Sequence, residues 1–184
     1  MIDVKSAPPI SRVSILGGPG SGKSTLAREV GQILGLEVVH MDALNFTKPA
    51  GYFLDHRDEF LQLTSKTLDG LEGWVSEGNY SNTYEKRLPE SDLVIYIDRP
   101  THKLMYGILK RRLQHQKKHR AEMPSDWKER LSWSFVRFVL RHNRTKRVQI
   151  LDAINLYAEG DKTFIVTNRR QQKRMLAELR GLSK

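Results

Sequence analysis

Cysteine is missing from the 184 residues, and no uninterrupted apolar run approaches the roughly 18 residues of a membrane span. A chain without cysteine has no disulfide, no thiolate metal site and no cysteine nucleophile, and this composition is typical of a cytosolic protein. The first ten residues lack the basic and apolar regions of a secretory signal. We therefore expect a cytoplasmic protein without a membrane partner.

Acidic residues are scarce in one long segment. From Arg99 to Arg147 there are 15 Lys or Arg residues and only 3 acidic ones, so this segment carries +12 while the whole chain carries +10. Positive charge attracts nucleotides, phosphorylated metabolites, nucleic acids or anionic lipids, and charge alone does not choose among them. With 39% hydrophobic and 28% charged residues, the composition is that of a folded domain.

Short apolar runs alternate with helical patterns. The runs predict strands at 13–16, 38–40, 74–77, 93–97 and 163–166, and helical spacing predicts helices at 22–34, 57–68, 101–118, 125–147 and 170–179. Residues 43–56 are expected to form a loop, and Asp98 is expected to cap a helix. The alternation predicts one α/β domain over residues 1–184, with a parallel sheet covered on both faces.

The first expected strand runs into a glycine-rich segment that matches the phosphate-binding pattern G-x-x-x-x-G-K-[ST]. Its residues are Gly17, Gly18, Pro19, Gly20, Ser21, Gly22, Lys23 and Ser24. Glycines let backbone N–H groups turn inward onto phosphate oxygens, and the helix that follows adds its positive dipole end. The alternative, a glycine-rich turn with an unrelated lysine, is disfavoured by the flanking strand and helix.

This loop predicts ATP and Mg²⁺ as cofactors. Lys23 is expected to reach the β- and γ-phosphates, Ser24 to bind Mg²⁺ and Thr25 to contact the α-phosphate. GTP-binding proteins carry an Asn-Lys-x-Asp motif after a strand, and the sequence has none.

Two acidic residues follow the second and third expected strands. Asp42 and Glu77 come at the carboxyl ends of these strands, the sheet edge that carries ligands in open α/β folds. Glu77 is expected to hold a water on Mg²⁺. The alternatives stay open: Asp42 could make a turn, and Glu77 could pair with a lysine. The six histidines show no metal-ligand spacing and are interpreted as structural or exposed.

Taken together, several segments resemble one family. They are the phosphate loop, VHMD at 39–42, WVSEGNY at 74–80, RLP at 87–89, and the strand that ends in DRP at 98–100 before the basic segment. Over residues 11–179 the chain resembles the DNA topology modulation proteins, also described as adenylate-kinase-related P-loop kinases. The resemblance implies a three-layer, nucleoside-kinase-like fold with a five-stranded parallel sheet and a mobile helical lid, here at about 110–147.

The resemblance also implies roles for residues at the site. Asp42 would meet the acceptor hydroxyl or the Mg²⁺ shell, as in shikimate-type kinases, and Asn168 would border adenine together with Arg169. The region expected to hold the acceptor contains Tyr52, Phe53, Arg57, Asn79 and Tyr80. Nucleoside-monophosphate kinases carry an arginine soon after the glycine of this motif, and residues 78–82 have none, which argues against a nucleoside monophosphate as acceptor.

Arginines of the basic segment resemble those that a kinase lid closes onto ATP. They are Arg111, Arg112 and Arg120, with at least one of Arg141, Arg144 and Arg147 also expected to face phosphates. The alternative for each is a solvated basic face.

The expected function is therefore Mg²⁺-dependent transfer of the ATP γ-phosphate to a small-molecule acceptor. The alternative is a nucleotide-binding regulatory or DNA-binding protein that affects DNA topology through the basic segment; an ATPase or GTPase switch is a weaker one. We expect weak, non-specific nucleic-acid binding at low salt from net charge. The choice between monomer and homodimer is left open.

Overall fold

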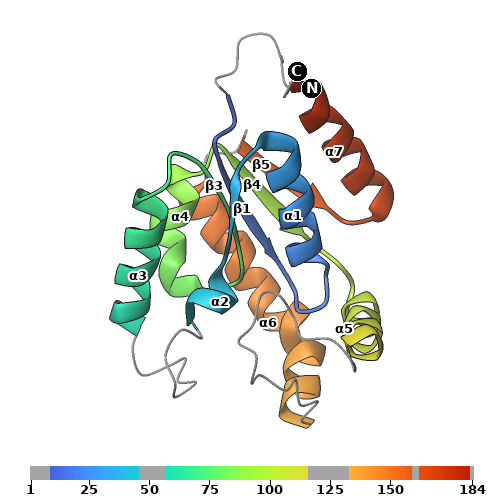
Figure 1. Cartoon of the computed structure of the whole chain (residues 1–184). Coiled ribbons are helices and arrows are strands. Elements are labelled where there is room, and N and C mark those ends of the chain that lie inside the picture. The colour runs from blue at the N-terminus through green and yellow to red at the C-terminus, as the bar shows by residue number, and fades with distance from the viewer. Residues whose placement is uncertain (1–8, 46–56, 116–132, 159–161, 183–184) are drawn as a thin grey trace.

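The computed structural model describes residues 9–45, 57–115, 133–158 and 162–182. Its strands form one parallel sheet in the order β2-β3-β1-β4-β5 (Figure 1). The strands are β1 (Arg12–Gly17), β2 (Glu37–His40), β3 (Trp74–Glu77), β4 (Leu93–Ile97) and β5 (Thr163–Val166). This sheet confirms the predicted α/β fold with five parallel strands.

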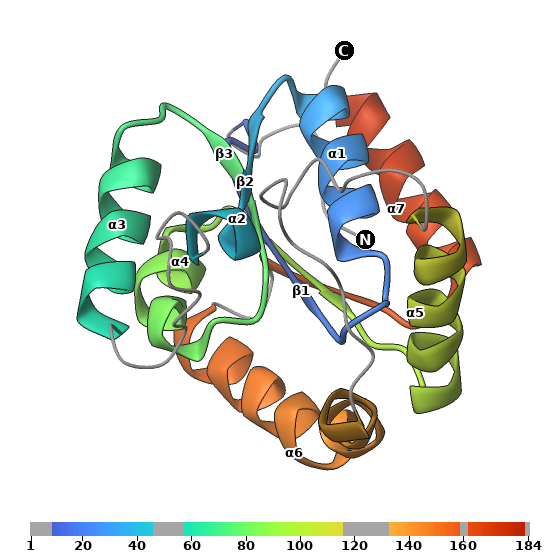
Figure 2. The same ribbon diagram turned by 60° about the horizontal axis from the view of Figure 1, so that its bottom comes forward.

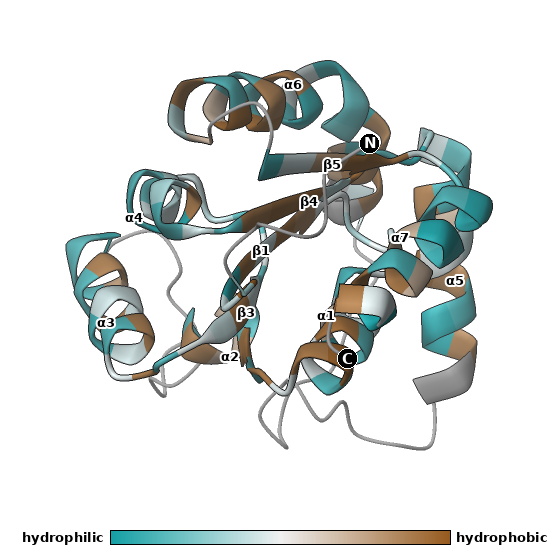
Figure 3. Ribbon diagram, turned by 90° about the horizontal axis from the view of Figure 1, so that it is seen from above, coloured by the Kyte–Doolittle hydropathy of each residue, from teal (hydrophilic) through white to brown (hydrophobic). Residues whose placement is uncertain are grey.

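Helices cover both faces of the sheet, as the view from above shows (Figure 3). One face packs on α1 and α7, the other on α4 and α6, while α2 and α3 cover the edge at β2. The helices are α1 (Lys23–Leu34), α2 (Met41–Asn45), α3 (Arg57–Asp69), α4 (Tyr84–Glu90), α5 (Thr101–His115), α6 (Trp133–Tyr157) and α7 (Arg169–Leu182), with a 3-10 turn at Ser81–Thr83. None of the described helices is long and apolar enough to cross a membrane.

The two faces follow from the alternation of side chains along β1. Val13 and Ile15 are buried in the cluster with α1 and α7, whereas Leu16 is buried in the cluster with α4 and α6. Successive side chains of a strand point to opposite faces, so each strand supplies both cores. Burying one such aliphatic side chain stabilises the fold by about 1.5–3 kcal/mol. Ile97 and Val166, which end β4 and β5, are also buried in the cluster with α1 and α7, and the segments that follow the carboxyl ends of β1, β2 and β3 carry the residues of the site.

A buried polar cluster lies beneath α4. Arg87 is fully buried and donates hydrogen bonds to the Thr83 hydroxyl (2.9 Å), the Ser76 hydroxyl (3.2 Å) and the Gly78 carbonyl (2.9 Å). Burial lowers the pKa of Arg87 to about 10, so it remains a cation at neutral pH. Arg87 thereby fixes the backbone at the end of β3, at the edge of the sheet formed by the carboxyl ends of the strands.

We expect Arg87→Ala to destabilise the fold by about 3 kcal/mol or more, because it opens a cavity and leaves three buried acceptors without their donor. Urea unfolding measures the change. The matched control is Arg174→Ala on α7, an exposed arginine paired with Glu178 four residues on, which should change stability by less than about 0.5 kcal/mol. Equal losses in the two variants would contradict the assignment.

Three local expectations from the sequence were wrong. The second basic helix was expected to end at residue 147, but α6 continues to Tyr157 because Ile150 and Ile154 pack onto the sheet. Helix α4 was not predicted, and α2 occupies the start of the expected loop at 43–56. The expected end of the first basic helix at 118, the expected start of the second at 125 and the rest of the loop at 43–56 lie outside the described residues.

Asp98 also differs from expectation. It was expected to cap the helix after β4, but α5 begins only at Thr101. The Asp98 carboxylate instead accepts hydrogen bonds from two guanidinium nitrogens of Arg147, at 2.8 and 3.0 Å. The pair ties α6 to the end of β4, and it directs Arg147 to a carboxylate rather than to a phosphate.

Candidate active site

The loop between β1 and α1 has the conformation that its glycines permit. Gly20 and Gly22 have φ values of +74° and +97°, in the left-handed region that disfavours other residues. A Cβ on Gly20 would lie 2.5 Å from the Leu104 carbonyl oxygen, and a Cβ on Gly107 would collide with the Gly20 carbonyl. Helix α5 therefore packs directly on the loop. The first turn of α1 contains no acidic residue, which leaves its N-terminus suited to an anion.

Lys23 and Ser24 begin α1 at the base of the loop. The Lys23 ammonium donates to the Gly18 carbonyl at 3.2 Å, which places it beside the loop backbone. The Ser24 hydroxyl donates to Glu77 Oε1 at 3.0 Å, and His40 Nδ1 lies 2.9 Å from the same oxygen. The structure thus brings together the two residues predicted to serve Mg²⁺, and it adds His40, which the sequence did not single out.

Glu77 is 3% exposed at the end of β3. Burial alone would raise its pKa, but hydrogen bonds from His40 and Ser24 and the charge of Lys23 outweigh burial, so the pKa of Glu77 lies below its ordinary value. It is therefore a carboxylate at neutral pH. No three His, Asp or Glu side chains of the described residues gather closely enough to hold a metal by themselves. A hydroxyl and one carboxylate suit Mg²⁺, which is usually completed by waters and substrate phosphates.

Asp42 lies one strand further along the same edge, in α2 directly after β2. The Tyr80 hydroxyl donates to Asp42 Oδ1 at 2.8 Å, and the Tyr80 ring packs on Phe60 with centroids 4.9 Å apart. Burial and the charge of Asp42 raise the pKa of Tyr80, which keeps its hydroxyl a hydrogen-bond donor. Two predicted acceptor residues are therefore in contact. Figure 2 shows this edge of the sheet, with α2 on one side and α5 on the other.

The remaining predicted acceptor residues are placed differently. Arg57 is exposed at the start of α3, where its carbonyl accepts a hydrogen bond from Asn82 (3.2 Å). Asn79 is engaged by the phosphate loop: its side chain accepts from the Gly17 N–H at 3.0 Å and donates to the Gly17 carbonyl at 2.5 Å. This contact gives Asn79 a positioning role that the sequence did not indicate, and its contact with an acceptor stays a prediction. Tyr52 and Phe53 lie outside the described residues.

An open cleft of about 1340 Å³ extends from the phosphate loop between α5 and α7. Among the described residues, its lining contains nine basic residues and one acidic residue: Lys23, Arg28, Arg99, Lys103, Lys110, Arg111, Arg169, Lys173 and Arg180, with Glu29. Such a lining suits a polyanion, and its length beyond the loop leaves room for the rest of a nucleotide.

Only some of the residues predicted to bind the nucleotide are among the described residues that line the cleft. Asn168 lines it beside Arg169, and the Asn168 side chain caps α7 by accepting from the Gln171 N–H at 2.9 Å. Arg111 also lines the cleft, whereas Arg112 is exposed and is not among the described residues of its lining. Arg141 and Arg144 on α6 are exposed. Arg120 lies outside the described residues.

His142 on α6 is the residue that sequence reasoning missed most clearly. It is 2% exposed, and a Cβ on Gly18 would lie 3.1 Å from its ring. Neither ring nitrogen has a hydrogen-bond partner within the described part of the chain. Burial and the nearby charges of Lys23 and Lys146 lower the pKa of His142 to about 4, an effect that Asp98 partly opposes. His142 is therefore a neutral imidazole against the phosphate loop.

This depressed pKa predicts a stability that depends on pH. The unfolded chain binds the proton near pH 6.5 and the folded chain only near pH 4, so stability is lost as pH falls through this window, by about 2–3 kcal/mol at its lower end. Urea unfolding of the wild type and of His142→Gln across the window measures the difference. Glu77 titrates below its ordinary value and adds its own loss only at the acid end. A pH dependence that is the same in both proteins would contradict the assignment.

Comparisons with known proteins agree with this architecture. A family model described as the ATPase family associated with various cellular activities (AAA) matches residues 13–104, from β1 into α5. A shikimate kinase from Acinetobacter baumannii in complex with shikimate is 15% identical, with a TM-score of 0.53 and coverage of 96% of this chain and 94% of that one. A gluconokinase from Sinorhizobium meliloti 1021 is also 15% identical, with a TM-score of 0.50 and coverage of 96% and 93%. At this identity the likeness shows the fold. No curated protein matches the sequence.

Proposed function

We propose that this chain, which belongs to the ATPase family associated with various cellular activities, is a kinase that transfers the γ-phosphate of ATP to a small-molecule acceptor. The family and the fold establish a P-loop nucleotide-binding protein built like small-molecule kinases. The choice of a kinase within that class is supported by the geometry of the sheet edge.

The proposal rests on one observation: Asp42 and Glu77 lie at the ends of the neighbouring strands β2 and β3, and their side chains have different contacts. Residues His40 and Glu77 are register partners on β2 and β3, so Asp42 follows directly beyond the Glu77 position. Glu77 contacts Ser24 at the start of α1, whereas Asp42 in α2 contacts Tyr80, whose ring packs on Phe60 of α3. One carboxylate thus serves the nucleotide end, and the other is available to orient a second substrate. Phosphoryl transfer requires this positioning of the attacking hydroxyl.

The residues present fit ATP and Mg²⁺. Backbone N–H groups of the loop and Lys23 would bind the phosphates, and the cleft at Asn168 and Arg169 would take the nucleoside. Ser24 and Glu77 would hold Mg²⁺ directly or through water, and the metal would neutralise charge on the β- and γ-phosphates. Asp42 would accept a hydrogen bond from the acceptor hydroxyl and so aim its oxygen at the γ-phosphorus.

The acceptor is proposed to be a small hydroxylated molecule. The two solved relatives are by their descriptions kinases of shikimate and gluconate. Residues 78–82 contain no arginine to pair with the phosphate of a nucleoside monophosphate, which disfavours that acceptor. The narrower resemblance to the DNA topology modulation group agrees with an adenylate-kinase-related enzyme. The comparisons give no support to an effect on DNA topology.

A screen of acceptors tests the proposal. The protein is incubated with ATP and Mg²⁺ and with sugars, hydroxy acids, nucleosides and nucleotides, and ADP release is measured with and without each compound. We expect one class to accelerate ADP release and to gain a phosphate in equal amount. ADP release that no acceptor accelerates, accompanied by inorganic phosphate, would identify an ATPase instead.

A lid at about 110–147 is part of the proposal, and Arg111 is the lid arginine that we propose contacts ATP. Arg111 lines the cleft and the neighbouring Arg112 does not, so the two residues form a matched pair of equal charge and chemistry. We expect Arg111→Ala to lower kcat/KM for ATP by about tenfold to a hundredfold, as for one charge-assisted contact, and Arg112→Ala to leave it within about twofold. Steady-state kinetics measures both, and equal effects would remove Arg111 from the site.

The same pair of variants tests the DNA-binding alternative. The basic side chains concentrate on a cleft beside the phosphate loop, which favours a localised polyanion over an extended duplex. A duplex surface would show binding that falls steeply with salt, by about 0.9 log units per phosphate contact for each log unit of salt. Tight duplex binding at physiological salt that is lost in either variant, together with intact ATP turnover, would replace the kinase proposal.

A further inference from the structure

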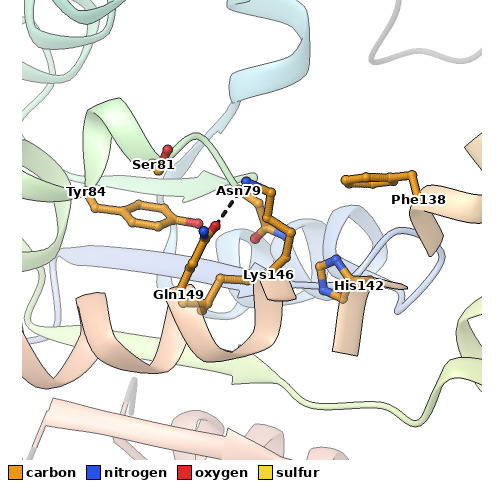
Figure 4. A pocket seen from close by; sticks show the side chains of 8 residues that line it. Asn79, Ser81, Tyr84, Phe138, His142, Lys146 and Gln149 are labelled. Carbon is orange, nitrogen blue, oxygen red and sulfur yellow. Dashed lines mark hydrogen bonds between the residues drawn. The ribbon is translucent and has the colours of Figure 1, made fainter. Parts of the chain in front are cut away.

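A small pocket lies on the other side of the phosphate loop from the nucleotide cleft. Figure 4 shows its side chains: His142, Lys146 and Gln149 come from α6, and Asn79, Ser81 and Tyr84 come from the segment after β3. Its volume is about 60 Å³, which by the same measure accommodates roughly four water molecules or one small polar group. The pocket therefore fits part of a ligand rather than a whole nucleotide.

The position of the pocket relates it to phosphoryl transfer. Lys23 places its ammonium at the Gly18 carbonyl, and His142 lies against Gly18. Asn79 is tied to Gly17 at the opposite wall of the pocket. The lysine of such a loop reaches the β- and γ-phosphates, so the pocket opens beside the terminal phosphate rather than beside the base.

The chemistry of the lining favours an anion. Lys146 supplies a positive charge, and its ammonium donates a 3.0 Å hydrogen bond to Gln149 Oε1, three residues further along α6 (Figure 4). Hydroxyl and amide groups of Ser81, Tyr84 and Asn79 supply further polar contacts, and no acidic residue belongs to the described lining. His142 brings two buried ring nitrogens that lack partners among the described residues. A buried polar group without a partner is costly, and a bound ligand can supply the missing partner.

We propose that this pocket, with Lys146 and His142 as its specificity-determining residues, binds an anionic group of the acceptor, a carboxylate or a phosphate. Lys146 pairs with the charge, and the imidazole N–H of His142 donates to one of its oxygens. The acceptor is then a small hydroxylated acid or phosphate ester, held with its anionic group at α6 and a hydroxyl at Asp42. This inference rests on the proposed kinase activity, and it names the class of acceptor.

Matched ligands test the inference. With ADP and Mg²⁺ saturating the loop, the wild type is titrated with D-gluconate, D-glycerate and glycerol 3-phosphate, and with the neutral counterparts sorbitol and glycerol. The ring ¹⁵N resonances of His142 report binding at the pocket, and the titration gives Kd. We expect at least one anionic ligand to shift these resonances and neither neutral counterpart to do so.

Variants separate the pocket from the nucleotide site. We expect Lys146→Met to raise the Kd of the anionic ligand by about tenfold or more, as for a lost charge-assisted contact, with ADP affinity unchanged. His142→Leu should weaken the same ligand and His142→Asn should restore part of the affinity. The control is Arg144→Met on α6, which removes an equal charge outside the described lining. Both Lys146 and Arg144 are exposed, so their replacement leaves the fold intact.

Each outcome decides between the readings. Equal binding of neutral and anionic ligands, no shift with any anionic ligand, or an equal loss in the Arg144 control would overturn the pocket assignment. Weakened ADP in the Lys146 variant would assign the lysine to the nucleotide and also overturn it. Anion binding without phosphate transfer would support the anion-binding role of the pocket and contradict the proposed kinase activity. Phosphate transfer to neutral acceptors alone would support the kinase activity and contradict the role of the pocket.

Discussion

Lys23→Met should lower kcat/KM for ATP by about a hundredfold to a thousandfold. The ammonium is a point charge aimed at the β- and γ-phosphates, and its loss removes a charge-assisted contact at the place where negative charge develops during transfer. A contact of this kind contributes about 3–4 kcal/mol to the transition state, and each 1.4 kcal/mol corresponds to a factor of about ten. Steady-state kinetics and calorimetry of ATP binding divide the loss between turnover and affinity.

The fold should survive this substitution. Lys23 makes a hydrogen bond to one loop carbonyl, at 3.2 Å, and its side chain is only partly buried. The matched control is Lys66→Met, an exposed lysine on α3 that has no part in the described cleft and should leave turnover unchanged. Unaltered ATP affinity and turnover in Lys23→Met would remove nucleotide binding from this loop.

A second readout of the same variant does not depend on activity. Lys23 lowers the pKa of both Glu77 and His142 through its charge. Its loss should therefore raise both values toward their ordinary ranges, although burial continues to hold the pKa of His142 down. Titration of the His142 ring resonances measures the change. A pKa that does not move would show that the ammonium lies elsewhere.

The nucleotide half of the site could be predicted because its determinants are local in sequence. A strand, a run of glycines and a helix specify the loop, and the parallel sheet brings strand ends to one edge. Ser24 and Glu77 are 53 residues apart, yet placing Glu77 at the end of a neighbouring strand was sufficient to bring them together. The sequence also placed Asp42 at the end of a different strand, although it left open whether Asp42 meets the acceptor hydroxyl or the Mg²⁺ shell.

The residues that were missed depend on long-range packing. His142 reaches the phosphate loop because α6 packs on the face of the sheet that includes Leu16 of β1. No spacing in the sequence marks one of the six histidines as buried. Asn79 was assigned to the acceptor by its motif, whereas its contact with Gly17 follows from the register of β1 and β3. His40 was set aside for the same reason, although its register partner is Glu77.

Some of the missed structure did leave a signal. The apolar residues Ile150, Ile154 and Tyr157 continue the helical spacing beyond residue 147 and pack with the sheet, so the length of α6 was readable. Helix α4 was harder to predict because it is seven residues long and contains Pro89, which removes a backbone donor and argues against a helix. Burial of Leu88 and Arg87 overrides that local preference.

Asp42→Asn is expected to separate chemistry from nucleotide binding. Asparagine keeps the shape of the side chain, and its carbonyl oxygen can still accept the hydrogen bond from Tyr80. What it loses is the negative charge and the ability to take a proton from an acceptor hydroxyl. Such a group contributes about 10²- to 10⁴-fold, so we expect kcat to fall by that range while ATP affinity stays within about threefold.

Two further variants distinguish the carboxylate from its surroundings. Tyr80→Phe keeps the ring packed on Phe60 and removes only the hydrogen bond to Asp42, so its loss of turnover should be smaller, about tenfold or less, as for one neutral hydrogen bond. Asp58→Asn removes an equal charge from the exposed start of α3 and should leave turnover unchanged.

The pattern across the variants assigns the role. Lost turnover with intact ATP binding in Asp42→Asn alone places the carboxylate on the attacking hydroxyl. If ATP affinity falls as strongly as turnover, Asp42 belongs to the metal shell with Glu77, and the acceptor is positioned by other groups. Full activity in Asp42→Asn would leave the strand end after β2 without a part in the reaction, and the distinction between the two carboxylates, on which the kinase proposal rests, would be lost.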